Sequence, residues 1–482
     1  MGTTAVLAAC LMAAQSVQAD DVQQQIDQLR DHLNSVQDET ARMREDLDVL
    51  RTQAGESWLT AARADEIRSL VHEVLIDADS RNNLVGDGLL GGWSDGFFLA
   101  SADGRFKLEI GGLLQERFLG GRLRRGATPI DDEWRYGFEN TRMRLNLGGW
   151  LFDRDTTFLI QPGWGWTDPH AIVDSASTTT LTGMESRLWD AWVRRRLSEQ
   201  WAVRMGIFQL PFTRESLISD TRQLAVDRSL IDYRLGLGRS QGVELTWMPS
   251  DAVRIIMAVS DGSLTRAGLI TTPSGGLPPT IPPWSALVFD AEWALTARGE
   301  WLLGGDWAQF QEFTSPPGSD TGVLLGLAVH GQHEERRGTG NPKTDSWGFT
   351  GDLSVALDGI SFFASGTYHH QKGYSTPVGN INTVEWLGWV FQGSTYLTDD
   401  TEWFMRWEGG GPKATQLGGA DVNIVTTGMN WYLEQQSLKV TSDFGFSMGK
   451  VPDSMQNLMV GWRTSGTRDG EWLFRTQLQL EF

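Results

Sequence analysis

The chain has 482 residues, 40% of them hydrophobic, and a formal net charge of −20 at pH 7. It contains no run of about 18 apolar residues, which excludes a transmembrane helix, and no basic surplus that would favour binding to nucleic acid. A transmembrane β-barrel escapes this test, because only alternate residues of its strands face lipid. The 22 tryptophans, many of them near the ends of alternating segments, favour such a barrel over a tryptophan-rich secreted binding protein.

Residues 1–19 are predicted to be a secretory signal peptide. They have an apolar centre and end on the small-residue pattern Val17-Gln18-Ala19, but they lack a basic start. A lipoprotein box at Leu7-Ala8-Ala9-Cys10 is the alternative for the same segment. Cys10 is the only cysteine, so the mature chain is expected to contain neither disulfides nor thiol chemistry.

Residues 20–80 are predicted to form helices in the periplasm. Over residues 20–53, apolar side chains recur at alternating spacings of four and three residues, with charged residues on either side. This heptad pattern predicts a coiled coil, and the alternative is one amphipathic helix that lies on its own domain. A weaker helical stretch follows at 58–76, and residues 81–103 are interpreted as a glycine-rich linker. The seam of the coiled coil consists of Val22, Ile26, Leu29, Leu33, Val36, Thr40, Met43, Leu47 and Leu50.

Residues 104–482 are predicted to be an all-β transmembrane barrel, because apolar and polar residues alternate along segment after segment. Short turns alternate with long polar connections, which would put the turns on one rim and the loops on the other, as in outer-membrane barrels. The pattern gives sixteen strands, or eighteen if two weaker stretches at 299–313 and 457–463 are counted. The sixteen are 106–119, 138–149, 155–164, 187–197, 201–208, 241–248, 252–260, 286–296, 322–333, 346–356, 360–371, 383–396, 401–408, 421–432, 438–448 and 471–482.

One stretch, residues 201–247, differs from the rest because its two strands enclose a long connection without strand periodicity. A connection of about thirty residues inside a compact domain usually has a function. This connection carries arginines and acids but no lysine. Its arginines are Arg214, Arg222, Arg228, Arg234 and Arg239, and its acids are Glu215, Asp220, Asp227 and Asp232.

Three motifs in this stretch resemble the phosphate-selective porin family. They are Gly206-Ile207-Phe208 with Pro211-Phe212, then Asp227-Arg228-Ser229, and finally Arg239-Ser240-Gln241-Gly242-Val243. The resemblance runs in pattern from residue 104 to Phe482. It implies a trimeric outer-membrane barrel of sixteen strands, in which a long loop at 209–240 folds inward and narrows the pore. The phosphate-selective members of that family use lysines in the constriction, whereas this loop offers only arginines.

A set of strand arginines is predicted to form the path of an anion through the barrel. Alternation turns them to one side of their strands, and an arginine facing lipid at mid-depth would cost roughly 2–4 kcal/mol, so they should face the lumen. A guanidinium stays charged and offers a planar fork to phosphate or carboxylate. The set is Arg142, Arg144, Arg194, Arg196, Arg204 and Arg254. The alternative is a structural role, in which these arginines pair with inward carboxylates, namely Glu109, Glu116, Glu139, Asp190 and Glu244.

The histidines do not predict a metal site. His330 and His333, followed by Glu334 and Glu335, have a spacing that suits a helix, but their segment has strand periodicity. They are interpreted as rim or loop histidines. No inward histidine accompanies a serine and an acid, and neither a Walker loop nor an HExxH motif occurs. The sequence predicts neither an enzyme nor a cofactor.

The predicted function is passive diffusion of small solutes through a homotrimeric outer-membrane porin that prefers anions, phosphate-like ions among them. Its partners would be outer-membrane lipids and small anionic solutes, and no nucleic acid. The alternative is a structural outer-membrane anchor whose coiled coil tethers the envelope. The two hypotheses differ in a simple test: a pore conducts after the coiled coil is deleted, whereas a tether keeps its partner when the pore is plugged.

Overall fold

The computed structural model describes part of the chain, and all of that part belongs to the compact unit Val74–Phe482. The predicted signal peptide, the predicted helices of residues 20–80 and the start of the predicted linker lie outside the described residues. No helix within the described ranges is long and apolar enough to cross a membrane. Those ranges are 89–93, 96–122, 134–165, 185–262, 291–334, 344–376, 379–413, 421–449, 451, 461–462 and 470–482.

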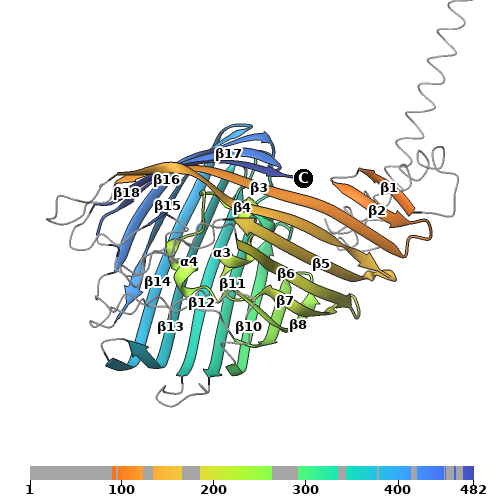
Figure 1. The fold of residues 1–482 in the computed structure, drawn as a ribbon, viewed down its shortest axis with the longest axis horizontal. Helices are drawn as coiled ribbons and strands as arrows, with labels where there is room; N and C mark the ends of the chain where they lie inside the picture. Colours follow the sequence, from red (N-terminus) through yellow and green to blue (C-terminus); the bar gives the residue numbers. More distant parts are fainter. Residues whose placement is uncertain are drawn as a thin grey trace, which may run out of the picture. The chain divides into compact units, whose positions relative to one another are not determined.

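Sixteen antiparallel strands, β3 to β18, close into one barrel (Figure 1). Each strand pairs with the next along the chain, and β18 pairs with β3 to complete the ring. The predicted sixteen-stranded barrel is thus confirmed. The strands are β3 (Phe106–Arg122), β4 (Trp134–Leu151), β5 (Asp153–Gly165), β6 (Glu185–Arg196), β7 (Trp201–Gln209), β8 (Arg239–Ser250), β9 (Val253–Ser260), β10 (Ala291–Gly304), β11 (Gly322–Glu334), β12 (Thr344–Leu357), β13 (Ile360–Thr376), β14 (Gly379–Thr398), β15 (Thr401–Pro412), β16 (Val422–Glu434), β17 (Leu438–Ser447) and β18 (Trp472–Glu481).

Two further strands lie outside the ring, in a place that the sequence did not predict. β1 (Leu89–Trp93) and β2 (Phe97–Ser101) form a hairpin, and β2 pairs with the first part of β3. The hairpin occupies residues that were interpreted as linker. The alternative of eighteen barrel strands is wrong, because β10 ends at Gly304 and residues 305–321 are not a strand. Of the other weak stretch, only residues 461–462 are described, and they belong to no named strand.

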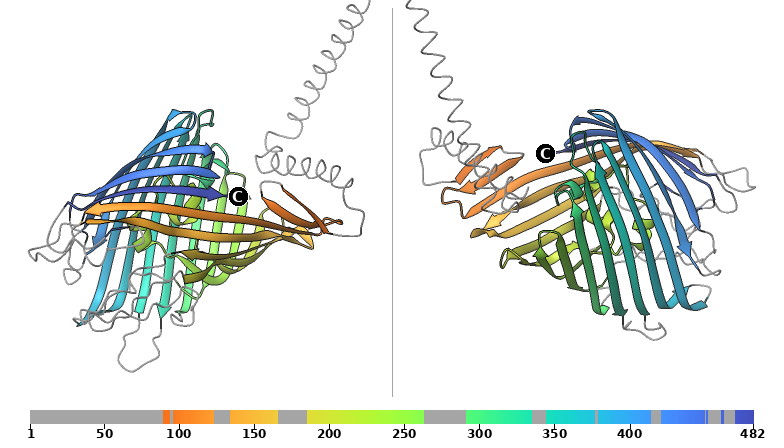
Figure 2. Two further views of the ribbon diagram at one scale, coloured as in Figure 1. Left: turned by 45° about the horizontal axis from the view of Figure 1, so that its top comes forward. Right: turned by 180° about the vertical axis from the view of Figure 1, so that it is seen from behind.

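The strands curve around the interior (Figure 2). Buried side chains of the wall are largely polar and exposed ones largely apolar, so the wall separates a polar inside from an apolar outside. On β15 the inward side chains Glu402, Phe404 and Arg406 are buried, whereas Trp403 and Met405 are exposed on the outer face. The same alternation holds on β10, β11 and β18. An apolar outer face with polar groups inside is the pattern of a barrel that stands in lipid.

The two rims differ as predicted. The predicted short turns are all present on one rim, as residues 152, 197–200, 251–252, 358–359, 399–400 and 435–437. The turn at 358–359 is an Asp-Gly pair in which Gly359 has φ +69°, a left-handed conformation that glycine adopts without steric cost. One connection on this rim was not predicted: residues 305–321, between β10 and β11, are far longer than the others.

Candidate constriction and ion path

The connection between β7 and β8, residues 210–238 (the constriction loop), lies inside the barrel. It contains α3 (Arg214–Leu217), a 3-10 turn η2 (Asp220–Arg222) and α4 (Leu230–Leu235). Ser229 caps α4, because its hydroxyl accepts a hydrogen bond from the N–H of Asp232 at 2.9 Å. That this loop sets the narrowest point of a pore remains a prediction.

Apolar packing holds one side of the constriction loop. Ile231 and Leu235 of α4 lie in a buried cluster with Trp386 and Val390 of β14. Gly388 allows the helix to come this close, since a Cβ at that position would lie 2.6 Å from Cγ2 of Ile231. Each fully buried aliphatic side chain contributes about 1.5–3 kcal/mol, so this contact alone favours an inward loop.

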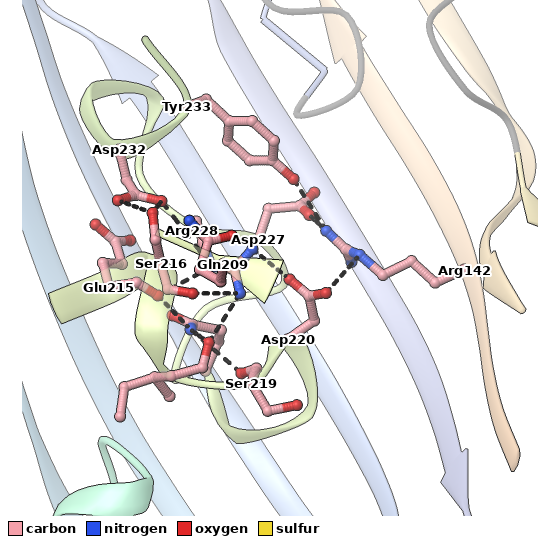
Figure 3. Close-up of polar contacts among 12 residues, drawn as sticks. Arg142, Gln209, Glu215, Ser216, Ser219, Asp220, Asp227, Arg228, Asp232 and Tyr233 are labelled. Carbon is pink, nitrogen blue, oxygen red and sulfur yellow. Dashed lines mark hydrogen bonds and ion pairs between the residues drawn. The ribbon is translucent and has the colours of Figure 1, made fainter. Parts of the chain in front are cut away.

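Charged contacts hold the other side, where Asp227 meets Arg142 of the wall (Figure 3) and two further wall arginines. Its carboxylate accepts a hydrogen bond from Arg142 of β4 at 2.5 Å. It also pairs with Arg117 of β3 and lies 3.6 Å from Arg475 of β18. One loop carboxylate thus joins three neighbouring strands around the point where the barrel closes.

A second loop carboxylate, Asp220, pairs with Arg144 of β4 and, at 2.7 Å, with Arg228 of the loop itself. Burial alone would raise the pKa of this carboxyl, but Arg228, Arg144 and Arg142 hold the pKa well below its ordinary value. Burial also opposes a lowered pKa at Asp227, where Arg142 and Arg117 again prevail. Both aspartates are therefore charged, and these contacts are ion pairs.

Wall side chains also hold the backbone of the constriction loop. Arg298 of β10 donates a hydrogen bond to the carbonyl of Phe212 at 2.8 Å and is itself fixed by a two-point contact with Asp352 at 2.8 and 2.9 Å. Further donors to loop carbonyls are Arg406, Asn430, Lys439 and Gln479. Sequence reasoning did not select Arg117, Arg298, Arg406 or Arg475, although the same alternation turns them inward.

The predicted strand arginines have different surroundings. Arg142 and Arg144 are buried, with 7% and 6% of their surfaces exposed, and both face loop carboxylates. Arg196 lies at the end of β6 beside the short-turn rim, 2.6 Å from Asp155. The other three, Arg194, Arg204 and Arg254, form a group on β6, β7 and β9 that keeps contact with solvent.

Within this solvent-facing group, Arg204 and Arg254 each have a carboxylate and an aromatic ring as neighbours. Arg204 pairs with Glu244 at 2.6 Å and lies over the ring of Phe208, 4.6 Å from its centroid. Arg254 pairs with Glu300 at 2.5 Å. Arg194 stands directly opposite Arg204 in the β6–β7 register, and no ion pair to it occurs among the described residues.

The predicted loop arginines are all engaged inside the barrel. Arg228 binds Asp220, as described above, and Arg214 donates to the carbonyl of Phe310. The remaining contacts are Arg222 with Glu481 at 3.2 Å, Arg239 with Asp190 at 2.9 Å, and Arg234 over the ring of Trp386 at 5.9 Å.

The predicted carboxylate partners are partly correct. Glu139, Asp190 and Glu244 pair with arginines, namely Arg117, Arg239 and Arg204. Glu109 instead contacts Lys107 at 2.9 Å. Glu116 was expected inside and this is wrong: its neighbours Gln115 and Arg117 occupy the inner face with 0% and 1% exposure, which turns Glu116 outward to Asn140 at 2.6 Å.

The interpretation of the histidines needs correction. His330 lies on the inner face of β11, 4% exposed, between Thr296 at 2.9 Å and Gln332 at 3.0 Å. His369 is likewise buried on β13, so strand alternation rather than the rim determines their positions. His333, by contrast, lies close to the end of β11. In the described part of the chain, no group of three or more His, Cys, Asp and Glu side chains could hold a metal ion.

Comparison with known proteins finds one family model and several solved structures to which the chain is similar. A model of the family described as phosphate-selective porin O and P matches residues 130–267. No curated protein sequence matches the chain. Among solved structures, the chain is similar to an anion-selective porin from Comamonas acidovorans, with 11% identity and a TM-score of 0.49, over 78% of this chain and 99% of that one.

Two other solved structures are similar to a comparable degree. The outer membrane channel DcaP of Acinetobacter baumannii shares 11% identity, with a TM-score of 0.48, over 78% of this chain and 97% of that chain. The trimer form of OmpT, an outer membrane protein of Vibrio cholerae, shares 10% identity, with a TM-score of 0.44, over 78% and 99%. Over residues 130–267 the chain is similar to the phosphate-selective porins O and P, and this stretch contains the constriction loop and all six strand arginines of the predicted anion path.

Proposed function

We propose that the protein is an outer-membrane porin that lets small solutes diffuse passively, prefers anions, and carries them along the inner face of β6 to β9. The observation that supports this most strongly is the solvent-facing group Arg194, Arg204 and Arg254. Elsewhere on the inner face, most arginines are buried against carboxylates of the wall or the loop. The porin match over residues 130–267 points in the same direction, to a channel rather than an enzyme.

The charge balance of this group favours anions. Arg204 and Arg254 each have one carboxylate partner, so their charges are largely offset locally. Arg194 has no such partner among the described residues and faces Arg204 across the strand pair. Like charges directly opposite each other are unfavourable, and an anion passing between them would relieve that repulsion.

The same geometry suits oxyanions. Guanidinium groups offer planar pairs of N–H donors that match phosphate and carboxylate, whereas a lysine would supply only a point charge. Phosphate-like ions therefore belong to the class of solutes that this path would accept. The structural alternative, an anchor whose coiled coil tethers the envelope, gives no reason for solvent-facing arginines inside the barrel.

We also propose that the protein assembles as a homotrimer through the outer face of β3 and β4. This face carries the Glu116–Asn140 pair, and a carboxylate facing lipid is unfavourable. Next to it, Tyr136 and Phe138 are 77% and 82% exposed, the two highest values among the large hydrophobic side chains. A second copy of the chain would cover both the polar pair and the two rings.

Reconstitution into planar bilayers tests the pore directly. The purified protein should give discrete conductance steps that persist when residues 20–80 are deleted. A folded protein that inserts into the bilayer and gives no steps would contradict the porin function. Conductance that disappears with residues 20–80 would contradict the independence of the pore from that segment.

A further inference from the structure

We propose that residues 305–321 (the strap), between β10 and β11, are a second constriction element: the strap enters the barrel from the short-turn rim, holds the constriction loop in place and positions Arg254 for passing anions. This inference rests on the proposed pore function. The other connections described on this rim contain between one residue, at 152, and four residues, at 197–200. The strap is several times longer than a hairpin between adjacent strands requires.

The strap is anchored to the rim near both ends, and at its start the indole N–H of Trp307 donates to the carbonyl of Asp251 at 2.7 Å. Near its start, the carboxylate of Asp306 accepts hydrogen bonds from the N–H groups of Ala308 at 2.7 Å and Gln309 at 3.0 Å, which fixes a short 3-10 turn. Near its end, the hydroxyl of Ser315 donates to the carbonyl of Leu357 at 2.6 Å. These hydrogen bonds fix the backbone path of the strap.

Between its anchors the strap crosses the interior towards the opposite wall. Phe313 is 5% exposed and packs on Phe363 of β13, with ring centroids 4.8 Å apart. The hydroxyl of Thr314 donates to Glu402 of β15 at 2.8 Å. Gln436, in the turn between β16 and β17, donates to Glu312 of the strap at 2.9 Å. The strap therefore links β10 with β15 to β17 and covers the space between them.

Inside the barrel the strap meets the constriction loop. The N–H of Phe313 donates to the carbonyl of Arg222 at 3.3 Å. Arg214 of α3 donates to the carbonyl of Phe310, and its guanidinium lies 5.9 Å from the centroid of that ring. The two segments enter from opposite rims, so each blocks the withdrawal of the other. Together they occupy part of the lumen, while Arg194, Arg204 and Arg254 on β6, β7 and β9 keep contact with solvent.

One strap residue also contacts the proposed ion path. The ring of Trp307 lies 4.4 Å from the guanidinium carbon of Arg254, and its indole N–H donates to the carbonyl of Asp251 at 2.7 Å. Arg254 is thereby held between this ring and Glu300. A guanidinium stacked on an aromatic face keeps its edge free for hydrogen bonds, so Trp307 is a positioning residue for Arg254.

The first experiment shortens the strap. Residues 305–321 are replaced by an Asp-Gly turn like that at 358–359, and folding is checked by heat-modifiable migration in gels. Single-channel conductance should rise, and trypsin should cleave the constriction loop faster than in the wild type. Phe313→Ala with Thr314→Ala is the milder variant, for use if the shortened barrel does not fold, and should act in the same direction. The control adds two residues to the turn at 399–400 on the same rim and should leave conductance unchanged.

The second experiment separates the positioning role of Trp307 from simple packing. Trp307→Ala should lower the anion preference, measured as the zero-current potential under a KCl gradient. Trp307→Phe keeps a ring beneath Arg254 and should restore that potential. Trp301→Ala, which removes an outward-facing ring from β10, is the matched control and should have no effect.

The outcomes distinguish this inference from the proposed function. If the wild type conducts and the folded strap variants keep its conductance and its zero-current potential, the strap is structural and the inference is wrong. If the wild type itself does not conduct, the porin function fails first. Equal potentials for Trp307→Ala and Trp307→Phe would contradict the positioning role, even where shortening the strap enlarges the pore.

Discussion

The inward-pointing arginines of this barrel differ in burial and in their partners. Arg144 is buried against Asp220, whereas Arg194 is exposed and has no ion pair among the described residues. Removing one member of a buried ion pair leaves an uncompensated charge inside the protein. Removing an exposed arginine leaves no such buried charge. Substitutions at the first site should change the stability of the loop, and substitutions at the second should change selectivity.

Arg144→Gln tests the buried site. It leaves Asp220 with one strong partner fewer, and loss of a partner from a buried pair typically costs about 3–5 kcal/mol. We expect a lower midpoint of heat-induced unfolding and faster tryptic cleavage between residues 214 and 234. When Arg144→Gln is combined with Asp220→Asn, the loss of stability should be smaller than the sum of the losses from the two single substitutions, since both remove the same contact. Fully additive losses would show that the pair does not hold the loop.

Arg194→Glu tests the exposed site. It replaces an uncompensated positive charge on the proposed path with a negative one, so the zero-current potential should shift away from anion preference while folding is retained. Arg195→Glu changes the next residue, whose side chain points to the other face of β6 and pairs with Asp153 at the rim. That control should leave the potential unchanged. An equal shift from both variants would mean that general surface charge, not the path, sets selectivity.

At the scale of elements, the constriction loop is held by packing on β14 and by two charged clusters, so it should behave as a fixed part of the barrel. Deleting residues 215–235 should enlarge single-channel conductance, because the deletion removes nearly all of α3 and the whole of η2 and α4 from the lumen. Trypsin should leave the loop of the wild type intact despite its arginines, since buried backbone is a poor protease substrate. Unchanged conductance after the deletion would place the constriction elsewhere.

The strands and short turns were predictable because their signal is local. Period-two alternation and tight turns depend on neighbouring residues, and they predicted most barrel strands to within a few residues. The main exception is β10, which was predicted at 286–296 and continues to Gly304. The strap and the β1–β2 hairpin were not predictable in this way. The burial of Phe313 depends on Phe363 and Arg222, which are distant in sequence. The glycine-rich sequence around the hairpin does not indicate that β2 pairs with β3.

The candidate site was predictable in part for the same reason. Alternation gives the side of the wall that a residue occupies, so Arg142 and Arg194 were both placed inside. It does not give the position of a loop that folds back, so it could not show that Asp227 meets Arg142 while Arg194 is left without such a partner. The buried arginines of β3 and β18, Arg117 and Arg475, carried the same local signal and were not selected.

At the scale of the whole molecule, the outer face of β3 and β4 should decide assembly. Glu116→Lys would place a positive charge at the proposed subunit contact and should shift the detergent-solubilised protein from trimer to monomer. Glu385→Lys, at an exposed position on β14, is the control and should leave the assembly intact. Sedimentation in matched detergent measures the mass of each. A wild type that sediments as a monomer would contradict the proposed trimer.

The anion preference of the barrel is the central claim, and the zero-current potential of the wild type across a planar bilayer tests it most directly. The net charge of −20 would by itself suggest cation preference, whereas the inner arginines of β6, β7 and β9 favour anions. Under a KCl gradient we predict a potential whose sign corresponds to faster passage of chloride than of potassium. A potential of the opposite sign would contradict the account, because the acidic loops and rims would then outweigh Arg194, Arg204 and Arg254.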